Sequence, residues 1–283
     1  MALVCLSDFE AYAKVHLPKA SWDFFAAGAD ECCTRDDNLM AYKRIRFRPR
    51  MLRDMSAMDT KTTILGTKIS FPVGIAPTGF HKLAWPDGEL STARASEAMN
   101  TCYIASTYSS CSVEEIAAAA PAGFRWFQLY ILQKRNLTER LVQRVEALGF
   151  QALVLTVDLP YPGKRRDDIR NNFSSSASLP VKNFEGAFEI DALPEIVTAV
   201  QGKVEVYLDG GIRTGGDVLK ALALGAKCVF IGRPALWGLA YKGEEGLKEV
   251  LKILRDEFRL SMALAGCRNV SEIGPHLLQY SRL

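Results

Sequence analysis

The chain has 283 residues, and its 35 Lys and Arg against 32 Asp and Glu give a formal charge of +3. Apolar residues make up 48% and charged residues 24%, which is typical of a globular protein and excludes a disordered chain, a coiled coil and collagen. A near-neutral chain lacks the concentrated basic face of a nucleic-acid-binding protein. No apolar run approaches the roughly 18 residues of a membrane span. We therefore expect neither nucleic acid nor membrane as a partner.

The cysteines and the chain ends bear on the cellular compartment. Seven cysteines are an odd number without a Cys-x-x-Cys pair, so we expect buried thiols in a reducing compartment and neither a disulfide framework nor a metal site. The first residues lack the basic start and apolar stretch of a signal peptide. The last three, Ser281-Arg282-Leu283, resemble the Ser-Lys-Leu peroxisomal address, with Arg keeping the charge of Lys.

Residues 1–61 predict a helical cap. Ser7 and Glu10 have the spacing of a capping box, and the helix that they open must end before Pro18. A second helix is expected around residues 22–27, with Gly28 as a left-handed C-cap. A third helix follows it.

From residue 62 the pattern changes to strands. Residues 62–70 predict a hairpin that turns at Gly66. Apolar strands then alternate with polar loops and with helices. Two such helices are expected at residues 136–148 and 217–224. The expected strands are 72–76, 102–106, 126–130, 152–156, 204–209 and 228–231. This alternation predicts a parallel α/β sheet with helices outside it.

The strand spacing is uneven. Most strand starts are about 25 residues apart, but the interval from 152 to 204 is about double and holds only a loop and one helix. A closed TIM (β/α)₈ barrel needs eight strands, and six are visible. The sheet is therefore either open or a barrel that lacks two units near residue 189. We treat the chain as one domain, with a cap at 1–61 and the barrel part at 62–283.

Polar groups follow the C-terminal ends of the first four strands, where parallel α/β folds bind ligands. The first strand is followed by Pro77, Thr78 and Gly79, which expose backbone and one hydroxyl, and the next three strands supply Ser106, Gln128, Tyr130 and Thr156. Any one of them could merely satisfy loop backbone groups. Four consecutive strands that each supply a neutral hydrogen-bonding group would suit a planar, neutral heterocycle.

The last two strands end in turns rich in glycine and arginine. The residues concerned are Asp209, Gly210, Gly211 and Arg213 after one strand, and Gly232 and Arg233 after the other. Glycines let a phosphate approach backbone N–H groups and arginine supplies charge-assisted donors, so the pair predicts a phosphate site. The alternative is two tight turns with solvated arginines.

A separate basic run follows the fourth strand. Arg165 in this run could pair with a substrate carboxylate, or the run could be an exposed one balanced by Asp167 and Asp168.

Together these residues resemble the FMN-dependent L-2-hydroxy-acid oxidases (the glycolate oxidase family), in particular its long-chain branch. The resemblance runs over nearly the whole chain, through residues 35–38, 44–50, 75–79, 126–130, 209–213, 220–227, 231–234 and 262–268. It implies that FMN is held by Pro77, Thr78, Gly79, Ser106, Gln128, Thr156, Asp209, Gly210, Gly211, Arg213, Gly232 and Arg233. It also implies substrate binding by Tyr130 and Arg165.

The implied reaction oxidises an (S)-2-hydroxy acid to a 2-oxo acid through flavin, which O₂ reoxidises with release of H₂O₂. The resemblance further implies a homo-oligomer. A peroxide producer fits a peroxisome and an import receptor that reads the C-terminal tripeptide.

The sequence departs from the family at the substrate site. Phe24 stands where many relatives have a tyrosine that contacts the substrate carboxylate. Between Phe188 and Ile190, relatives carry two more strands with a flavin-side lysine, a histidine base and an arginine clamp, and none of these exists here. Of the three histidines, only His81 follows a strand end and is a candidate substitute base; His16 and His276 are not.

These departures leave alternatives open. Losing a general base costs about 10²–10⁴ in rate, so the chain is an oxidase or an inactive, internally shortened form that binds flavin or a partner. Exon skipping or a faulty gene model would produce such a form. A phosphosugar isomerase or aldolase would explain the phosphate site only. Two missing strands would leave the neighbouring strand edges unpaired and the apolar barrel interior uncovered, which favours aggregation.

Overall fold

The computed structural model describes residues 2–130, 135–157, 163–173 and 204–280. The expected break at 188–190 and the C-terminal tripeptide lie outside these residues. All the candidate site residues lie within them.

The central sheet consists of six parallel strands, at the positions that the apolar runs predict. In sheet order they are β7 (Leu153–Leu155), β6 (Arg125–Leu129), β5 (Tyr103–Ala105), β4 (Val73–Ile75), β9 (Cys228–Ile231) and β8 (Tyr207–Asp209). The first parallel strand in the chain, β4, pairs with the last, β9. That pairing is the closing seam of a barrel, so the curled sheet is a barrel that stays open between β7 and β8 over the described residues.

The open edge exposes apolar side chains. On β7, Leu153 is 47% exposed and Leu155 50% exposed, and Val204, shortly before β8, is also exposed. In a complete barrel, flanking strands and helices cover such positions. Because Leu153 and Leu155 lie opposite Phe127 and Leu129, these exposed side chains are on the helix-facing side of the sheet, and the expectation of an uncovered barrel interior stays a prediction.

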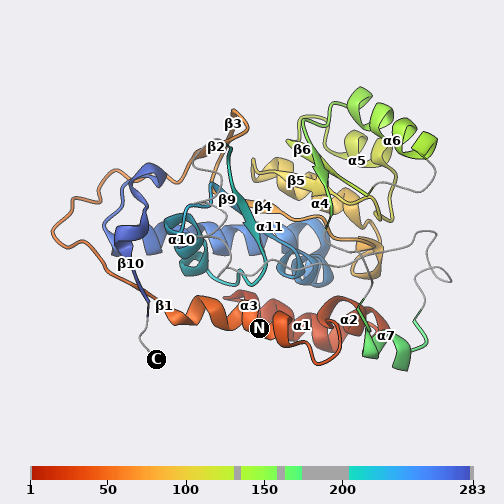
Figure 1. Cartoon of the computed structure of the whole chain (residues 1–283), viewed down its shortest axis with the longest axis horizontal. Helices are drawn as coiled ribbons and strands as arrows, with labels where there is room; N and C mark the ends of the chain where they lie inside the picture. Colours follow the sequence, from red (N-terminus) through yellow and green to blue (C-terminus); the bar gives the residue numbers. More distant parts are fainter. Residues whose placement is uncertain (1, 131–134, 158–162, 174–203, 281–283) are drawn as a thin grey trace.

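Helices cover the outer face of the sheet (Figure 1). They are α4 (Glu89–Ala98), α5 (Val113–Ala119), α6 (Arg135–Ala147), α10 (Gly215–Ala223) and α11 (Arg233–Ala265). Helix α7 (Arg166–Arg170) lies apart from them, against the cap (Figure 1). The long helix α11 breaks at Lys242 and Gly243, where the backbone is not helical. A Cβ on Gly243 would lie 2.4 Å from the indole nitrogen of Trp85, so this residue must be glycine for the kink to pack.

The barrel interior is filled by aromatic rings and closed at one end by the hairpin. The ring of Trp126 lies 5.7 Å from that of Phe230, and Gly74 leaves room for Phe230, since a Cβ there would lie 2.4 Å from the ring. Strands β2 (Thr62–Ile64) and β3 (Thr67–Ile69) pack Ile64 and Ile69 against this interior. The expected turn at Gly66 is confirmed, with φ of 77°.

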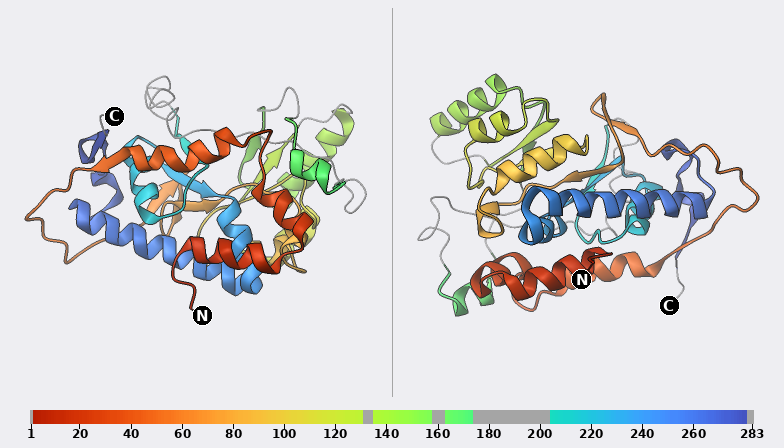
Figure 2. Two further views of the ribbon diagram at one scale, coloured as in Figure 1. Left: turned by 90° about the horizontal axis from the view of Figure 1, so that it is seen from below. Right: turned by 180° about the vertical axis from the view of Figure 1, so that it is seen from behind.

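The cap helices α1 (Leu6–His16), α2 (Lys19–Ala26) and α3 (Cys33–Arg44) form a layer on one side of the molecule (Figures 1 and 2). The end of α1 before Pro18 is confirmed. The capping box at Ser7 and Glu10 is wrong. The helix begins earlier, and the Asp8 carboxylate accepts hydrogen bonds from the backbone of Val4 (2.8 Å) and Cys5 (3.2 Å).

The expected left-handed C-cap at Gly28 is also wrong. Helix α2 ends at Ala26, and Ala27 is extended (φ −70°, ψ 171°). The physical reason lies in tertiary contact, because the Arg233 guanidinium takes the carbonyls of Phe25 (3.0 Å) and Ala27 (3.3 Å) as acceptors. A helix-terminating glycine would have pointed these carbonyls elsewhere.

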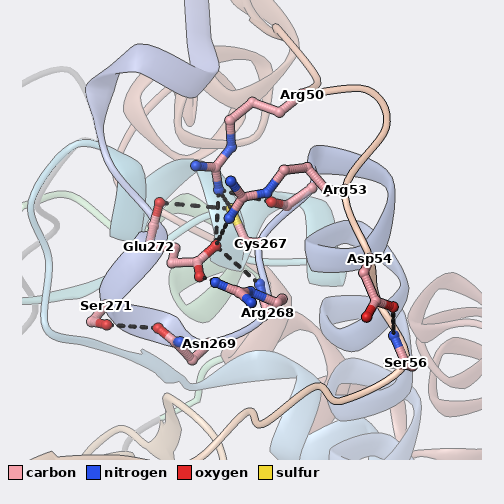
Figure 3. A network of polar contacts seen from close by, with 10 residues as sticks. Arg50, Arg53, Asp54, Ser56, Cys267, Arg268, Asn269, Ser271 and Glu272 are labelled. Carbon is pink, nitrogen blue, oxygen red and sulfur yellow. Dashed lines mark hydrogen bonds and ion pairs between the residues drawn. The ribbon is translucent and has the colours of Figure 1, made fainter.

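A polar network ties the segment that joins cap and barrel to the end of α11 (Figure 3). After β1 (Ile45–Phe47), which pairs with β10 (Leu278–Tyr280), Arg50 donates to the carbonyl of Gly266 at 2.8 Å and to Glu272 at 3.2 Å. Arg53 and Arg268 also contact the Glu272 carboxylate, at 3.0 and 3.2 Å. Arginines at the C-terminus of a helix satisfy its last carbonyls and complement its dipole.

Short 3₁₀ helices, η1 (His81–Leu83), η3 (Val270–Glu272) and η4 (Pro275–Leu277), complete the described elements. All seven cysteines are free, and four of them are buried: Cys102, Cys111, Cys228 and Cys267. The expectation of buried thiols is wrong for Cys5, Cys32 and Cys33, which lie in the cap and are partly or fully exposed. Within the described ranges, no helix combines the length and the hydropathy needed to span a membrane.

Candidate active site

A continuous chain of neutral polar groups runs across the tips of β5, β6 and β7. The Ser106 hydroxyl donates to the Gln128 side chain at 3.0 Å, and the Gln128 amide donates to the Thr156 hydroxyl at 2.9 Å. Ser106 and Gln128 are buried, and Thr156 is half-buried. The structure therefore brings together three of the predicted residues, and their mutual bonds fix how each presents its remaining polar atoms.

The loop after β4, which carries Pro77, Thr78 and Gly79, lies between the tips of β5 and β9. The backbone N–H of Ala76 donates to the carbonyl of Ile231 at 2.9 Å. A Cβ placed on Gly232 would lie 3.2 Å from the Thr78 methyl group. The loop thus borders both the neutral polar groups and the glycine-rich turns.

The two glycine-rich turns lie at one edge of the sheet. Strands β8 and β9 are parallel neighbours with Asp209 opposite Phe230, so the turns that follow them are adjacent. Gly210 and Gly211 have positive φ of 97° and 71°, which favours glycine. The helix α11 starts directly after Gly232, and helix N-termini favour anions.

The cap packs directly on these turns. The Tyr42 hydroxyl donates to the carbonyl of Gly210 at 3.0 Å, and a Cβ on Gly211 would lie 2.1 Å from the carbonyl oxygen of Asn38. Burial raises the pKa of Tyr42 far above its usual value, so this hydroxyl is a neutral donor. Helix α3 is thus held against the rim of the site.

Arg213 places a partly buried positive charge at the rim. Its nearest carboxylate is that of Glu10 on α1, at 3.8 Å, and its own Nη1 reaches the carbonyl of Ile212 at 3.4 Å. Burial lowers the pKa of the guanidinium, and Glu10 and Asp217 oppose this shift. Among the described residues, the side chain of this partly buried cation makes only these long contacts, and its place beside the glycine-rich turns suits it to bind a phosphate.

The predicted substrate residues come from two further segments. The backbone N–H of Tyr130 donates to the Thr107 hydroxyl at 3.3 Å, and the ring packs on Tyr108 at 5.2 Å. Arg165 lies over the ring of Phe24 at 5.3 Å and donates to its carbonyl at 2.5 Å. Arg165 also forms an ion pair with Asp168, and both side chains are largely buried. The charge balance expected of this run is present, but Arg165 is not the exposed residue of that interpretation, and its role toward a substrate stays a prediction.

An aromatic cluster surrounds Phe24, the residue that the resemblance places where many relatives would have a tyrosine. Its ring lies 5.9 Å from that of Phe80 and 5.0 Å from that of Phe173. Sequence reasoning missed Phe80, Phe173 and Tyr108. Phe80 directly follows Gly79 and adopts a positive φ of 59°, but no periodicity in the chain signals a contact between three separate segments.

The structure excludes His81 as a substitute base. It is fully buried, its Nδ1 pairs with the Thr92 hydroxyl at 2.8 Å, and its Nε2 pairs with the Thr78 hydroxyl. Burial lowers its pKa. The idea that it replaces the missing base is therefore wrong, because neither ring nitrogen is available to a substrate. His16 and His276 are exposed, on α1 and η4.

Comparison with known proteins identifies the family to which the chain belongs. The sequence matches the FMN-dependent dehydrogenase family in two stretches, residues 13–189 and 185–280. It is 51% identical to 2-hydroxyacid oxidase 2 of Bos taurus and 50% identical to that of Homo sapiens, each covered completely, as is this chain. Among solved structures, a mandelate oxidase variant with (S)-mandelic acid superposes with a TM-score of 0.90 at 34% identity and full coverage of both chains.

The comparison also bears on the shortening. The alignment with the bovine relative runs over 353 positions, whereas this chain has 283 residues, a difference of 70. The two matched stretches meet at residues 185–189, where the uneven strand spacing predicts the break. Its sequence and its half-open barrel together show that the chain belongs to the FMN-dependent dehydrogenase family.

Proposed function

We propose that the chain binds FMN at the C-terminal edge of its sheet and belongs, by activity, to the oxidases that convert an (S)-2-hydroxy acid to a 2-oxo acid with O₂ as the final electron acceptor. The observation that carries this proposal is the continuity of the site. The polar tips at Ser106, Gln128 and Thr156 adjoin, through the loop at Thr78, the turns at Gly210 and Gly232. A phosphorylated, planar heterocycle matches both halves.

The residues present fit FMN. Arg213 and Arg233 would hold the phosphate, with the backbone N–H groups of the glycine turns and the N-terminus of α11. The neutral chain from Ser106 to Thr156 would hold the ring and ribityl oxygens. When bound, FMN would supply the acceptor for the two electrons removed from the substrate.

For the substrate, the Tyr130 hydroxyl would donate a hydrogen bond to the 2-hydroxy acid, and the Arg165 guanidinium would bind its carboxylate. The Arg165 guanidinium would have to exchange Asp168 for the substrate carboxylate, since the two now form an ion pair. Phe24, Phe80 and Phe173 contribute no hydrogen-bond donor from their side chains, so the adjoining wall favours an apolar substrate tail.

One observation favours a second candidate, a flavin-binding protein without turnover. The chain has three histidines; one is enclosed and the other two are exposed on α1 and η4. No histidine is therefore placed to accept the proton that leaves the substrate. Loss of such a base lowers the rate by a factor of about 10²–10⁴. Loss of the arginine clamp that the resemblance implies for relatives also removes the group that orients the reacting carbon.

One experiment separates these candidates. The purified protein is reconstituted with FMN and mixed, without air, with an apolar (S)-2-hydroxy acid while the flavin absorbance is followed. Bleaching supports the oxidase, and a yellow protein that stays unbleached supports the flavin-binding candidate. A protein that is colourless once unbound FMN has been removed overturns both.

Location and assembly are part of the proposal. The tripeptide Ser281-Arg282-Leu283 would address the chain to the peroxisome through an import receptor, which suits an enzyme that releases H₂O₂. A homo-oligomer would follow the family. Deletion of the tripeptide in cells, and sedimentation of the purified chain, test the two statements.

A further inference from the structure

A buried carboxylate and a buried imidazole lie directly behind the candidate FMN site. Glu89 begins α4 and is fully buried, as is His81. Neither of them reaches the site surface. Burying a charged carboxylate is costly unless several donors compensate for the lost water, so the contacts of Glu89 indicate what it does.

Glu89 accepts hydrogen bonds from two different loops. Its Oε1 accepts the backbone N–H of His81 at 3.0 Å and that of Ser110 at 2.8 Å, and its Oε2 accepts the Ser110 hydroxyl at 2.7 Å. The loop at 77–83 carries Thr78, and the loop at 106–112 starts with Ser106. One carboxylate therefore joins the loop that carries Thr78 to the loop that carries Ser106, the first group of the polar chain.

The charge on Glu89 is retained despite its burial. Burial raises the pKa of Glu89, but the hydrogen bonds that its carboxylate accepts from Ser110 lower it, and the pKa lies below the usual value. A carboxylate at the first residue of a helix is also favoured by the helix dipole. Glu89 is thus an ionised acceptor, which a neutral amide would not replace.

His81 extends this connection to the site itself. Because burial lowers its pKa, the ring is neutral and offers one N–H and one lone pair. Nδ1 pairs with Thr92 and Nε2 with Thr78. If Nε2 carries the proton, it donates to the Thr78 hydroxyl; if it does not, it accepts a hydrogen bond from that hydroxyl. In either case this bond determines whether the Thr78 hydroxyl can donate or accept a hydrogen bond toward a ligand.

We propose that Glu89 and His81 are positioning residues for the cofactor: Glu89 locks the loops 77–83 and 106–112 together, and His81 fixes the orientation of the Thr78 hydroxyl beside Gly232. Direct contact between the loops supports this, since the backbone N–H of Phe80 donates to the carbonyl of Tyr108 at 3.2 Å. This inference rests on the proposed function only in the test that measures FMN binding; the test by hydrogen exchange does not depend on it.

The first test needs no cofactor. In the apoprotein, Glu89→Gln is expected to raise amide hydrogen exchange in both loops together, because the His81 and Ser110 N–H groups lose a shared acceptor. Glu97→Gln is the matched control, since Glu97, on the same helix α4, also accepts a backbone N–H, that of Ala122 at 2.7 Å, which lies outside both loops. Unchanged exchange in either loop of Glu89→Gln overturns the locking role. If that variant fails to fold, Glu89→Asp, which keeps the charge on a shorter side chain, takes its place.

The second test uses FMN, with binding followed by quenching of flavin fluorescence. Loss of a hydrogen bond that orients a ligand group weakens binding about ten-fold, so we expect that change for His81→Ala. His81→Gln, which keeps a donor and an acceptor, should recover most of the affinity, and its flavin absorption spectrum should match the wild type more closely. Equal affinities for His81→Ala and wild type overturn the role of His81. If the wild type itself binds no FMN, the proposed function fails, while the exchange test still decides whether Glu89 locks the loops.

Discussion

Substitution of Gly211 by alanine tests whether the cap and the glycine-rich rim form one packed unit. The new Cβ would lie 2.1 Å from the carbonyl oxygen of Asn38 and 2.7 Å from the ring of Tyr42, in a backbone with φ of 71°. The left-handed conformation costs alanine about 1–2 kcal/mol, and overpacking adds typically 1–3 kcal/mol. Since Asn38 contributes backbone, a side-chain rotation cannot relieve the contact. We therefore expect a loss of about 2–5 kcal/mol and separation of α3 from the rim.

Gly66→Ala is the matched control, because its φ of 77° is similar but no atom lies within 4 Å of the new Cβ. It should lose only the conformational cost, about 1–2 kcal/mol. The assay is urea unfolding of both variants, combined with limited proteolysis of the cap. Gly211→Ala should unfold at a lower urea concentration and release the cap segment faster. Equal losses in the two variants would refute the packing argument, since only contact with the cap distinguishes the two sites.

Three further predictions follow from single side chains. Arg213→Gln should weaken FMN binding about 10- to 100-fold but leave riboflavin binding, measured by the same fluorescence quenching, unchanged; equal weakening of both would show that Arg213 does not bind the phosphate. His81 has a lowered pKa in the folded state, so its stabilising effect is complete above its ordinary value of 6.5 and is lost as the pH falls below that value, by up to about 1.4 kcal/mol per pH unit. Urea unfolding at pH 7 and pH 5 should show this loss in the wild type and a smaller one in His81→Gln, and equal losses would contradict it. Leu155→Lys, on the exposed edge strand β7, should reduce light scattering in concentrated solution, whereas unchanged scattering would exclude this edge as the surface that associates.

The strands and their polar tips could be predicted because each depends on local pattern. An apolar run such as 228–231 is visible in the sequence, and the side chains after it must lie at the C-terminal edge of a parallel sheet. The hairpin at Gly66 and the end of α1 before Pro18 are local in the same sense. Even the shortening is visible in the sequence. The interval between the strand starts at 152 and 204 is too long for one strand–helix unit and contains too few apolar runs for three.

The errors concern residues whose role depends on distant partners. Gly28 is the residue type that commonly ends a helix in the left-handed conformation. The end of α2 is instead set by Arg233, more than 200 positions away in the chain, which donates hydrogen bonds to the carbonyls of Phe25 and Ala27. His81 follows a strand end, as a base would, yet Thr78 and Thr92 enclose it. The aromatic wall of Phe24, Phe80 and Phe173 joins three segments that no periodicity connects.

Calorimetric titration of the apoprotein with FMN, and separately with riboflavin, tests the central assignment most directly. If the tips of β4 to β7 hold the ring and the turns after β8 and β9 hold the phosphate, FMN should bind at one site per chain, and riboflavin should bind there more weakly. Absence of FMN binding, or equal affinity for the two flavins, would contradict the assignment of this edge of the sheet as a flavin-phosphate site.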